Sequence, residues 1–176
     1  RTQGLEATSV AAIAKMADVA AGTFYLYFSS KEDLLIEVFR DDVERIWRDA
    51  FGLLRASDPV ADQLLGIFER ATAVHDQDPE LSAVYFREIH FVSDPVRETV
   101  MSLSATIMER LEKVVNRAVA RGELSDRAEV PVLVRMFFEL WFCSMLIHYG
   151  HREPAEQTLE NLARPLRSTL ALLTPG

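Results

Sequence analysis

Cysteine is almost absent from this chain of 176 residues, in which Cys143 is the single thiol. One thiol cannot form a disulfide within the chain, so cross-links of that kind do not hold the fold together. Cys143 lies in the apolar run 137–147. We therefore expect it to be a buried structural residue rather than a redox sensor.

Long apolar runs and an excess of positive charge are also missing. No run approaches eighteen uninterrupted apolar residues and no secretion signal is visible, so we expect a cytoplasmic protein without a membrane partner. The formal net charge is −8, which by itself does not favour nucleic acid as a partner. Glycine-rich phosphate loops, a nucleophile elbow and a His-Glu-x-x-His pair are absent as well, so the sequence indicates neither enzyme chemistry nor a cofactor.

Helical spacing is what the chain has along most of its length, since apolar residues recur at intervals of three and four and strand alternation is lacking. The sequence therefore predicts an all-α fold. Proline and glycine mark the expected helix ends at Asp78-Pro79, Asp94-Pro95, Gly122 and Gly150. The expected long helices are 31–54, 59–75, 79–91, 95–121, 130–149 and 154–173. Ser30, or Ser29 with Glu32 as a capping box, is expected to start the first of them.

The segment 8–33 predicts two short helices joined by a tight turn. Thr8 is a suitable N-cap for the first of them. Neither helix is long enough to be stable alone, so each must pack on a neighbour. This arrangement is the sequence form of a helix-turn-helix, whose second helix enters the major groove of DNA. The apolar positions are Val10, Ile13, Ala14 and Ala17 in the first helix and Ala21, Phe24 and Phe28 in the second.

The run TSVAAIAKMADVAAGTFYLYFSSKEDLL at 8–35 resembles the DNA-binding segment of the TetR family of bacterial regulators, most specifically in GTFYLYF at 22–28 and SKEDLL at 30–35. The resemblance implies a helix-turn-helix DNA-binding domain over 1–40 and a helical ligand-binding and dimerisation domain over 41–176. It also implies a further helix before Arg1, which this sequence lacks.

The DNA contacts are taken from the resemblance, position by position. It implies phosphate contacts by four side chains, close approach of the recognition helix at a glycine, and a hydrogen bond from a threonine to a base edge or phosphate. An alternative for the two tyrosines is simple packing on the long helix. The positions are Thr8, Tyr25, Tyr27 and Lys31 for phosphates, with Gly22 and Thr23 on the recognition helix.

This chain also departs from the family pattern. Ala20 stands where many members have a serine N-cap, and Ala11 and Ala12 replace a basic and an acidic residue. From Ala20 to Phe28 there is no Arg, Lys, Asn or Gln, the residue types that make paired hydrogen bonds to G or A. We therefore expect specificity to come from Thr23, methyl contacts through Ala20 and Ala21, DNA shape and an N-terminal arm outside this sequence.

A ligand cavity is expected among the middle helices, because large deformable apolar residues are more numerous there than tight packing needs. Such a cavity binds an apolar or amphipathic small molecule. Plain core packing is the alternative for each residue. Arg87, Glu88, His90 and His148 are the polar residues able to orient a ligand, although exposure is their default. The candidate lining is Trp47, Phe68, Phe86, His90, Met101, Met108, Phe137, Phe138, Trp141 and Met145.

The last two helices predict a homodimer, since they carry more apolar surface than one small domain is expected to bury, and a palindromic operator requires two-fold symmetry. An ordinary monomeric core is the alternative. The residues concerned are Val132, Leu133, Met136, Phe137, Leu140, Trp141 and Ser144 in the first helix and Leu159, Leu162, Ala163, Leu166 and Leu170 in the second.

Together these features predict a ligand-responsive transcriptional regulator, a repressor that binds a palindromic operator in double-stranded DNA as a dimer. A small apolar molecule releases it by tilting the long helix 31–54. A di-iron enzyme is the first alternative, but Glu88 and His90 are two residues apart rather than three. A ligand-binding protein that has lost DNA binding is the second. No metal site is expected, because His148 and His151 lack a third ligand nearby.

Overall fold

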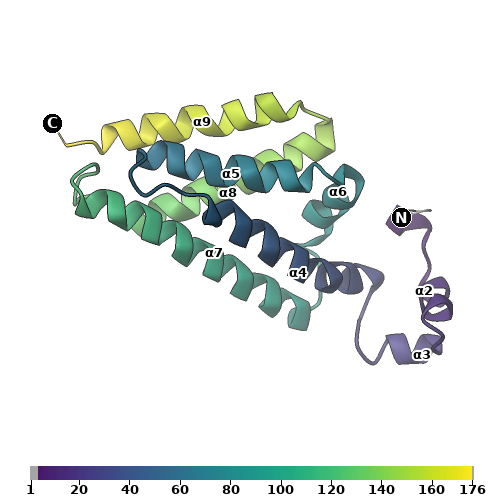
Figure 1. Ribbon diagram of the computed structural model, residues 1–176. Helices are drawn as coiled ribbons and strands as arrows, with labels where there is room; N and C mark the ends of the chain where they lie inside the picture. Colours follow the sequence, from purple (N-terminus) through teal and green to yellow (C-terminus); the bar gives the residue numbers. More distant parts are fainter. Residues whose placement is uncertain (1–3, 176) are drawn as a thin grey trace.

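The computed structural model describes residues 4–175, and within them the chain is helical with no strand. The all-α prediction is thus confirmed (Figure 1). The expectation of a helix before Arg1 lies outside the described residues. The helices are α1 (Gly4–Ala7), α2 (Val10–Met16), α3 (Ala21–Phe24), α4 (Lys31–Gly52), α5 (Val60–His75), α6 (Pro79–Glu88), α7 (Asp94–Ala120), α8 (Val130–His151) and α9 (Ala155–Leu172).

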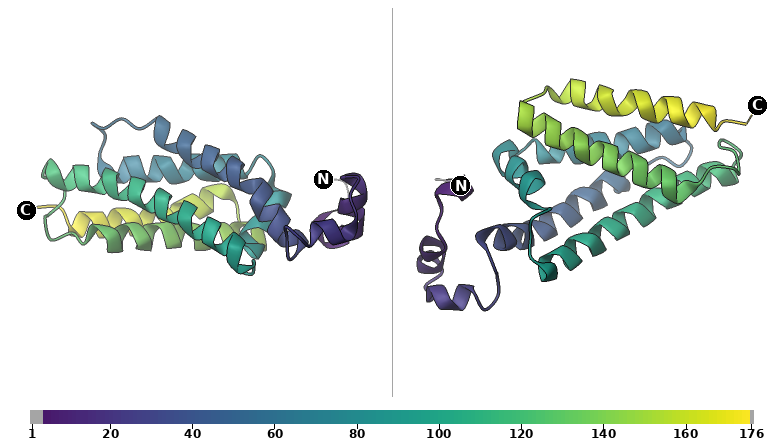
Figure 2. Two further views of the ribbon diagram at one scale, coloured as in Figure 1. Left: turned by 90° about the horizontal axis from the view of Figure 1, so that it is seen from below. Right: turned by 180° about the vertical axis from the view of Figure 1, so that it is seen from behind.

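The molecule has two parts of unequal size. Helices α4 to α9 form an elongated bundle, whereas α2 and α3 pack on each other beyond the N-terminal end of α4 (Figures 1 and 2). The C-terminus lies at the opposite end of the bundle. Within the bundle, α8 packs against α6, α7 and α9, and α5 lies against α4, α7 and α9. The small unit therefore projects from the body that carries it.

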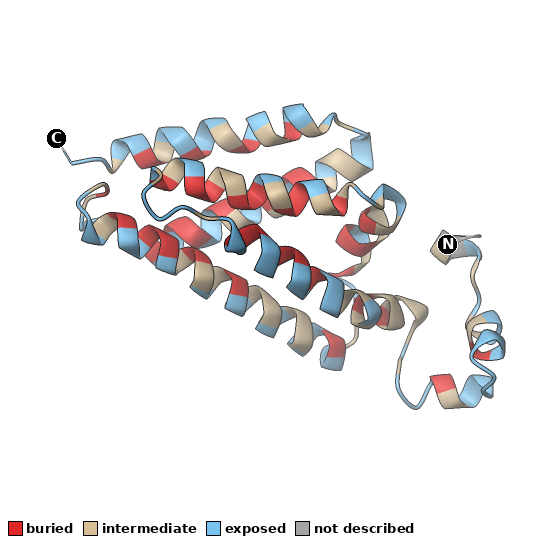
Figure 3. Ribbon diagram, in the orientation of Figure 1, coloured by how far each residue is buried: buried red, intermediate tan, exposed pale blue. Residues whose placement is uncertain are grey.

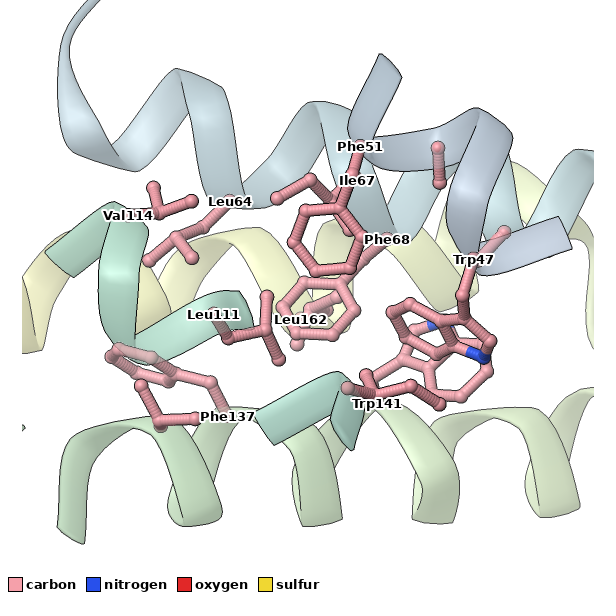
Figure 4. Close-up of a cluster of buried hydrophobic side chains, with 14 of the residues drawn as sticks. Trp47, Phe51, Leu64, Ile67, Phe68, Leu111, Val114, Phe137, Trp141 and Leu162 are labelled. Atoms are coloured by element: carbon pink, nitrogen blue, oxygen red, sulfur yellow. The ribbon is translucent and has the colours of Figure 1, made fainter. Parts of the chain in front are cut away.

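Buried residues line the inward sides of the bundle helices (Figure 3), and aromatic side chains fill its centre (Figure 4). Trp47 of α4 meets Trp141 of α8 edge to face, with ring centroids 5.0 Å apart, and Phe68 of α5 stacks on Trp141 at 5.9 Å. The indole Nε1 of Trp141 donates to Thr72 Oγ1 at 3.0 Å, so its polar atom is satisfied inside the core. These contacts join α4, α5 and α8 into one packed body.

Helix α8 is long and apolar enough to cross a bilayer by length and composition. Phe137, Trp141 and Met145 are buried on its inner side against the rest of the bundle. A helix that packs on three neighbours and buries aromatic residues there behaves as a central bundle helix.

The end of the bundle remote from α2 and α3 is held by side-chain to backbone hydrogen bonds. Arg121, after α7, donates to the carbonyl oxygens of Ala56 at 2.6 Å and Asp58 at 2.9 Å. Glu123 accepts from the backbone N–H of Val60 at 2.6 Å. The connection between α4 and α5 is thereby fixed to the end of α7.

Candidate nucleic-acid interface and ligand cavity

Helices α2 and α3 form one small unit around Phe24. Ser9 is the N-cap of α2, accepting from the backbone N–H of Ala12 at 3.1 Å, so the expectation that Thr8 has this role is wrong by one residue. Ala14 and Phe24 are the buried residues of the two helices, and the ring of Phe28 lies 5.5 Å from that of Phe24. The inward face predicted from the spacing is therefore present in part, whereas Ala17 and Ala21, which were also predicted to face inward, are exposed.

The turn after α2 has a left-handed residue that is not glycine. Asp18 has φ 55°, its N–H donates to Lys15 O at 3.2 Å, and the N–H of Val19 donates to Ala14 O at 3.0 Å. This is the Schellman pattern that satisfies the last carbonyls of a helix. After α7 the same pattern has Gly122 with φ 74° at the equivalent place. The turn that orients α3 therefore carries some backbone strain at Asp18.

The recognition segment is shorter than predicted but presents the expected surface. Helix α3 ends at Phe24, and i to i−3 hydrogen bonds continue to Tyr27. Ala20 provides no side-chain cap, as its identity implies. Tyr25 is 60% and Tyr27 76% exposed, so neither packs on α4 as the alternative required. A Cβ built on Gly22 meets no atom within 4 Å.

Lys31 uses its ammonium group inside the protein. Its Nζ donates to the backbone oxygen of Leu5 at 2.6 Å and to that of Thr8 at 3.2 Å. Lys31 is the first residue of α4, so this side chain ties the segment before α2 to the start of the long helix. Its phosphate contact stays a prediction, and the structure adds this positioning role.

A buried carboxylate joins the small unit to the bundle. Asp33 of α4 is 1% exposed; its Oδ2 accepts from the N–H of Ser29 at 3.2 Å and its Oδ1 from that of Ser93 at 2.9 Å. Ser93 is the N-cap of α7, and Ser29 lies between α3 and α4. Ser30 caps α4 by accepting from Asp33 N at 3.0 Å, as predicted, so the Ser29 and Glu32 alternative is not realised. Sequence reasoning missed the link to Ser93, which is 60 residues away.

A cavity of about 520 Å³ lies among α4, α6, α7 and α8. It contains most of the predicted lining, whereas three of those residues lie in the solid core instead. Phe68, Phe137 and Met145 are almost fully inaccessible and do not border the cavity. The residues that do border it are Trp47, Phe86, His90, Met101, Met108, Phe138 and Trp141.

One buried titratable group of the cavity wall, His75, was not predicted. His75 lies among the rings of Tyr85, Phe86 and Trp141, and its Nδ1 is 3.3 Å from Ser82 Oγ. Burial lowers the pKa of His75 to about 4, against the opposing charge effect of Asp76. Burial also raises the pKa of Tyr85. His75 lies seven residues after Phe68 and therefore on the same helical face. This spacing was the signal from which its inward position could have been predicted.

The other polar candidates do not line the cavity. Arg87 pairs with Glu88 at 2.7 Å outside it. His148 forms hydrogen bonds with the carboxylate of Asp76 through Nε2 at 2.9 Å and with the backbone oxygen of Glu153 through Nδ1 at 2.6 Å. That histidine thus links α8 to the end of α5 and the turn before α9. Within the described residues, no three His, Cys, Asp or Glu side chains gather as a metal site.

The outward face of α8 carries an apolar stripe made of Val132, Met136, Cys143 and Ile147, all exposed. The expectation that Cys143 is buried is wrong, because the apolar run 137–147 is helical and its residues point to both sides of α8. This stripe has helical spacing of three and four residues, interrupted by Glu139.

The apolar stripe of α9 faces its own bundle. Leu162, Leu166 and Leu170 are buried within a single copy, and so are Leu133 and Phe137 of α8. The argument that one domain cannot bury all of this surface is therefore wrong for those residues. Dimerisation through the last two helices stays a prediction.

Profiles of known families match two parts of the chain. The profile of bacterial regulatory proteins of the tetR family matches residues 1–38. That of the tetracyclin repressor-like C-terminal domain matches residues 57–142. The first part contains the α2–α3 unit, and the second contains most of the cavity wall.

Individual proteins are similar over most of the chain. The fatty acid metabolism regulator protein of Bacillus subtilis is 25% identical over 139 residues, covering 77% of this chain and 70% of the relative. The HTH-type transcriptional repressor KstR of Rhodococcus jostii is 26% identical over 172 residues, covering 97% of this chain and 74% of the relative. The crystal structure of Thermus thermophilus FadR in complex with lauroyl-CoA has a TM-score of 0.73 at 21% identity, covering 94% of this chain and 86% of that one.

Proposed function

This chain belongs to the tetR family of bacterial regulatory proteins, and from that premise we propose that it represses transcription as a dimer until an acyl-chain ligand enters its cavity. It is a DNA-binding regulator that responds to a ligand. The observation that carries the proposal is the pairing of an exposed tyrosine-bearing helix-turn-helix with an apolar cavity in the bundle that supports it.

On the DNA side, the α2–α3 unit enters the major groove. Tyr25 and Tyr27 are exposed on the projecting surface and contact phosphates, and Thr23 reaches a base edge or phosphate. The open space at Gly22 lets the backbone of α3 come close to the duplex. Thr8 lies beside this surface, where its carbonyl is held by Lys31.

The ligand is an amphipathic molecule with a long apolar tail. The cavity wall is mostly aromatic, aliphatic and methionine side chains, which suit such a tail. The relative named as a fatty acid metabolism regulator and the neighbour crystallised with lauroyl-CoA support an acyl-CoA. His75 and His90 are the histidines in the wall, and the low pKa of His75 keeps it uncharged at neutral pH, as an apolar ligand requires.

Coupling between the two sites runs through α4. Trp47 of this helix borders the cavity, and Asp33 at its start holds the connection to α3 as well as the N-cap of α7. A ligand that displaces α7 from α4 changes the geometry at Ser93 and Ser29 together. The separation of the two recognition helices in the dimer then no longer fits successive major grooves.

Two copies associate through the outer stripe of α8 and the adjoining side of α9. Val132, Met136 and Ile147 supply exposed apolar area on a helix that already contributes to the core. The acidic body does not contact the phosphates, because the α2–α3 unit projects beyond it (Figure 1). The regulator acts in the cytoplasm and catalyses no reaction.

The test is a mobility-shift assay with the purified regulator and the DNA upstream of its own gene. We expect a salt-dependent shift that lauroyl-CoA reverses, and that Tyr25→Ala weakens about tenfold or more. Tyr149→Phe is the matched control, because it changes a tyrosine remote from the DNA. The absence of a shift at low salt would instead favour a ligand-binding protein without an operator.

A further inference from the structure

A second hollow of about 700 Å³ lies beside the ligand cavity, on the surface between α4 and α7. The two hollows share Trp47, Leu103 and Ile107, so one layer of apolar side chains separates them. Charged and hydroxyl side chains of both helices line the rest of this groove. An apolar chamber therefore adjoins a polar groove across the contact of two helices.

Two arginines of the groove, Arg48 on α4 and Arg110 on α7, lie close enough for their charges to interact, and neither has an acidic partner in the described residues. Within residues 4–175 neither Arg48 nor Arg110 forms an ion pair, whereas Arg45 pairs with Asp42 at 2.6 Å on the outside of α4. Partial burial and the positive charge of Arg48 lower the pKa of Arg110. Its guanidinium lies 4.1 Å above the ring of Phe51, which leaves its edge available for hydrogen bonds.

Repulsion between two guanidinium groups is unfavourable unless an anion lies between them. Glu44 and Glu98 also line the groove, yet neither forms an ion pair with these arginines in the described part of the chain. Guanidinium forks match the oxygens of a phosphate in pairs, which makes two adjacent arginines a suitable receptor for that group.

We propose that Arg48 and Arg110 bind the phosphate-bearing head of the ligand whose apolar tail occupies the neighbouring cavity. The inference rests on the proposed function for the tail and adds the chemistry of the head. A molecule held in this way passes through the layer of Trp47, Leu103 and Ile107 and separates α4 from α7. Ligand binding in the cavity and groove then directly displaces α4.

The experiment compares Arg48→Gln/Arg110→Gln with Arg45→Gln/Arg117→Gln. Each double variant removes one arginine from α4 and one from α7, so net charge is matched while only the first pair lines the groove. Binding of lauroyl-CoA, dodecyl phosphate and dodecanol is measured by calorimetry. We expect the groove variant to bind the two phosphates at least tenfold more weakly than the control variant, with dodecanol unchanged.

The outcomes separate this inference from the proposed function. A wild-type protein that binds dodecanol as tightly as both lauroyl-CoA and dodecyl phosphate, or a groove variant equal to the control for all three probes, overturns the phosphate subsite and leaves the apolar cavity in place. A wild-type protein that binds none of the three probes overturns the proposed ligand class itself. A loss confined to lauroyl-CoA supports recognition of nucleotide phosphates, and an equal loss for dodecyl phosphate supports recognition of any phosphate head.

Discussion

At the scale of single residues, the informative positions are those whose environment inside the protein does not explain their identity. Gly22 has no positive φ and no neighbour that a methyl group would meet, so neither backbone conformation nor internal packing requires glycine there. Gly52 and Gly150 are equally unobstructed, so it is the place of Gly22 on the projecting α3 that favours close approach of DNA as its role. Asp18, by contrast, occupies a left-handed position at some cost to the fold.

Gly22→Ala is expected to weaken operator binding about tenfold while the free energy of unfolding stays equal or rises by about 0.5–1 kcal/mol, since alanine favours a helix. Gly150→Ala is the control, because its added methyl also meets no atom but lies in α8. Mobility shift and urea unfolding measure the two quantities. Unchanged operator affinity in Gly22→Ala would remove this glycine from the interface.

His75 predicts a pH dependence of stability. Its pKa is about 4 in the folded protein and near 6.5 when unfolded, so between these values the unfolded chain binds a proton that the folded chain does not. Stability from this group is complete above about pH 6.5 and falls as the pH is lowered toward 4. Urea unfolding should show wild type losing about 2 kcal/mol more than His75→Phe between pH 7.5 and 5. Equal losses would contradict the assignment.

At the scale of helices, apolar spacing predicted which faces are buried but not what covers them. The long helices end within three residues of the predicted limits because prolines and glycines mark them in the sequence. Leu162 and Leu166 were attributed to a dimer, yet their own bundle covers them. Phe68 and Met145 were attributed to a cavity although they pack solidly. The spacing of apolar residues does not tell which helix packs on which. The hydrogen bond between Asp33 and Ser93 depends on that packing, and it could therefore not be predicted.

Removal of that bridge is expected to uncouple operator binding from ligand binding. Asp33→Ala leaves the N–H groups of the exposed Ser29 and the half-buried Ser93 without their carboxylate acceptor, and it removes two charge-assisted hydrogen bonds worth up to about 1.5–3 kcal/mol each. We expect the ratio of operator affinities without and with lauroyl-CoA to fall toward one in mobility-shift titrations. Glu32→Ala, the adjacent acidic residue, should keep the wild-type ratio.

A second variant covers the case in which Asp33→Ala fails to fold. Ser93→Pro removes the donor from the α7 side alone, and the φ of Ser93 at −64° already suits proline. A wild-type response to lauroyl-CoA in this variant would show that the bridge does not transmit the signal.

At the scale of the whole molecule, the proposed function requires two copies held in fixed relation. One copy carries one α2–α3 unit at the end of its bundle, and a palindromic operator presents two half-sites about one helical turn apart. The exposed stripe on α8 lies on the outside of the bundle, on a helix that also borders the ligand cavity. In the proposed dimer, association and ligand binding therefore both involve α8.

Met136→Lys/Ile147→Lys is expected to give a monomer that binds the operator at least a hundredfold more weakly, because two charges are placed in the proposed interface. Leu53→Lys changes another exposed apolar residue, outside the stripe, and should remain dimeric. Sedimentation velocity measures the assembly. A dimeric double variant would place the interface elsewhere.

Arg121 donates hydrogen bonds to Ala56 and Asp58 just after α4, and Glu123 accepts one from Val60 at the start of α5, so α4 has a fixed base. A 22-residue helix is a rod of about 33 Å, so rotation by about 5° about this base moves its tip by about 3 Å. In a symmetric pair the displacement doubles, to about 6 Å against a groove repeat of about 34 Å. Because α4 is long, a sub-ångström shift near its fixed base would become a displacement of several ångströms at the recognition helices, which would then no longer match the spacing of the DNA grooves.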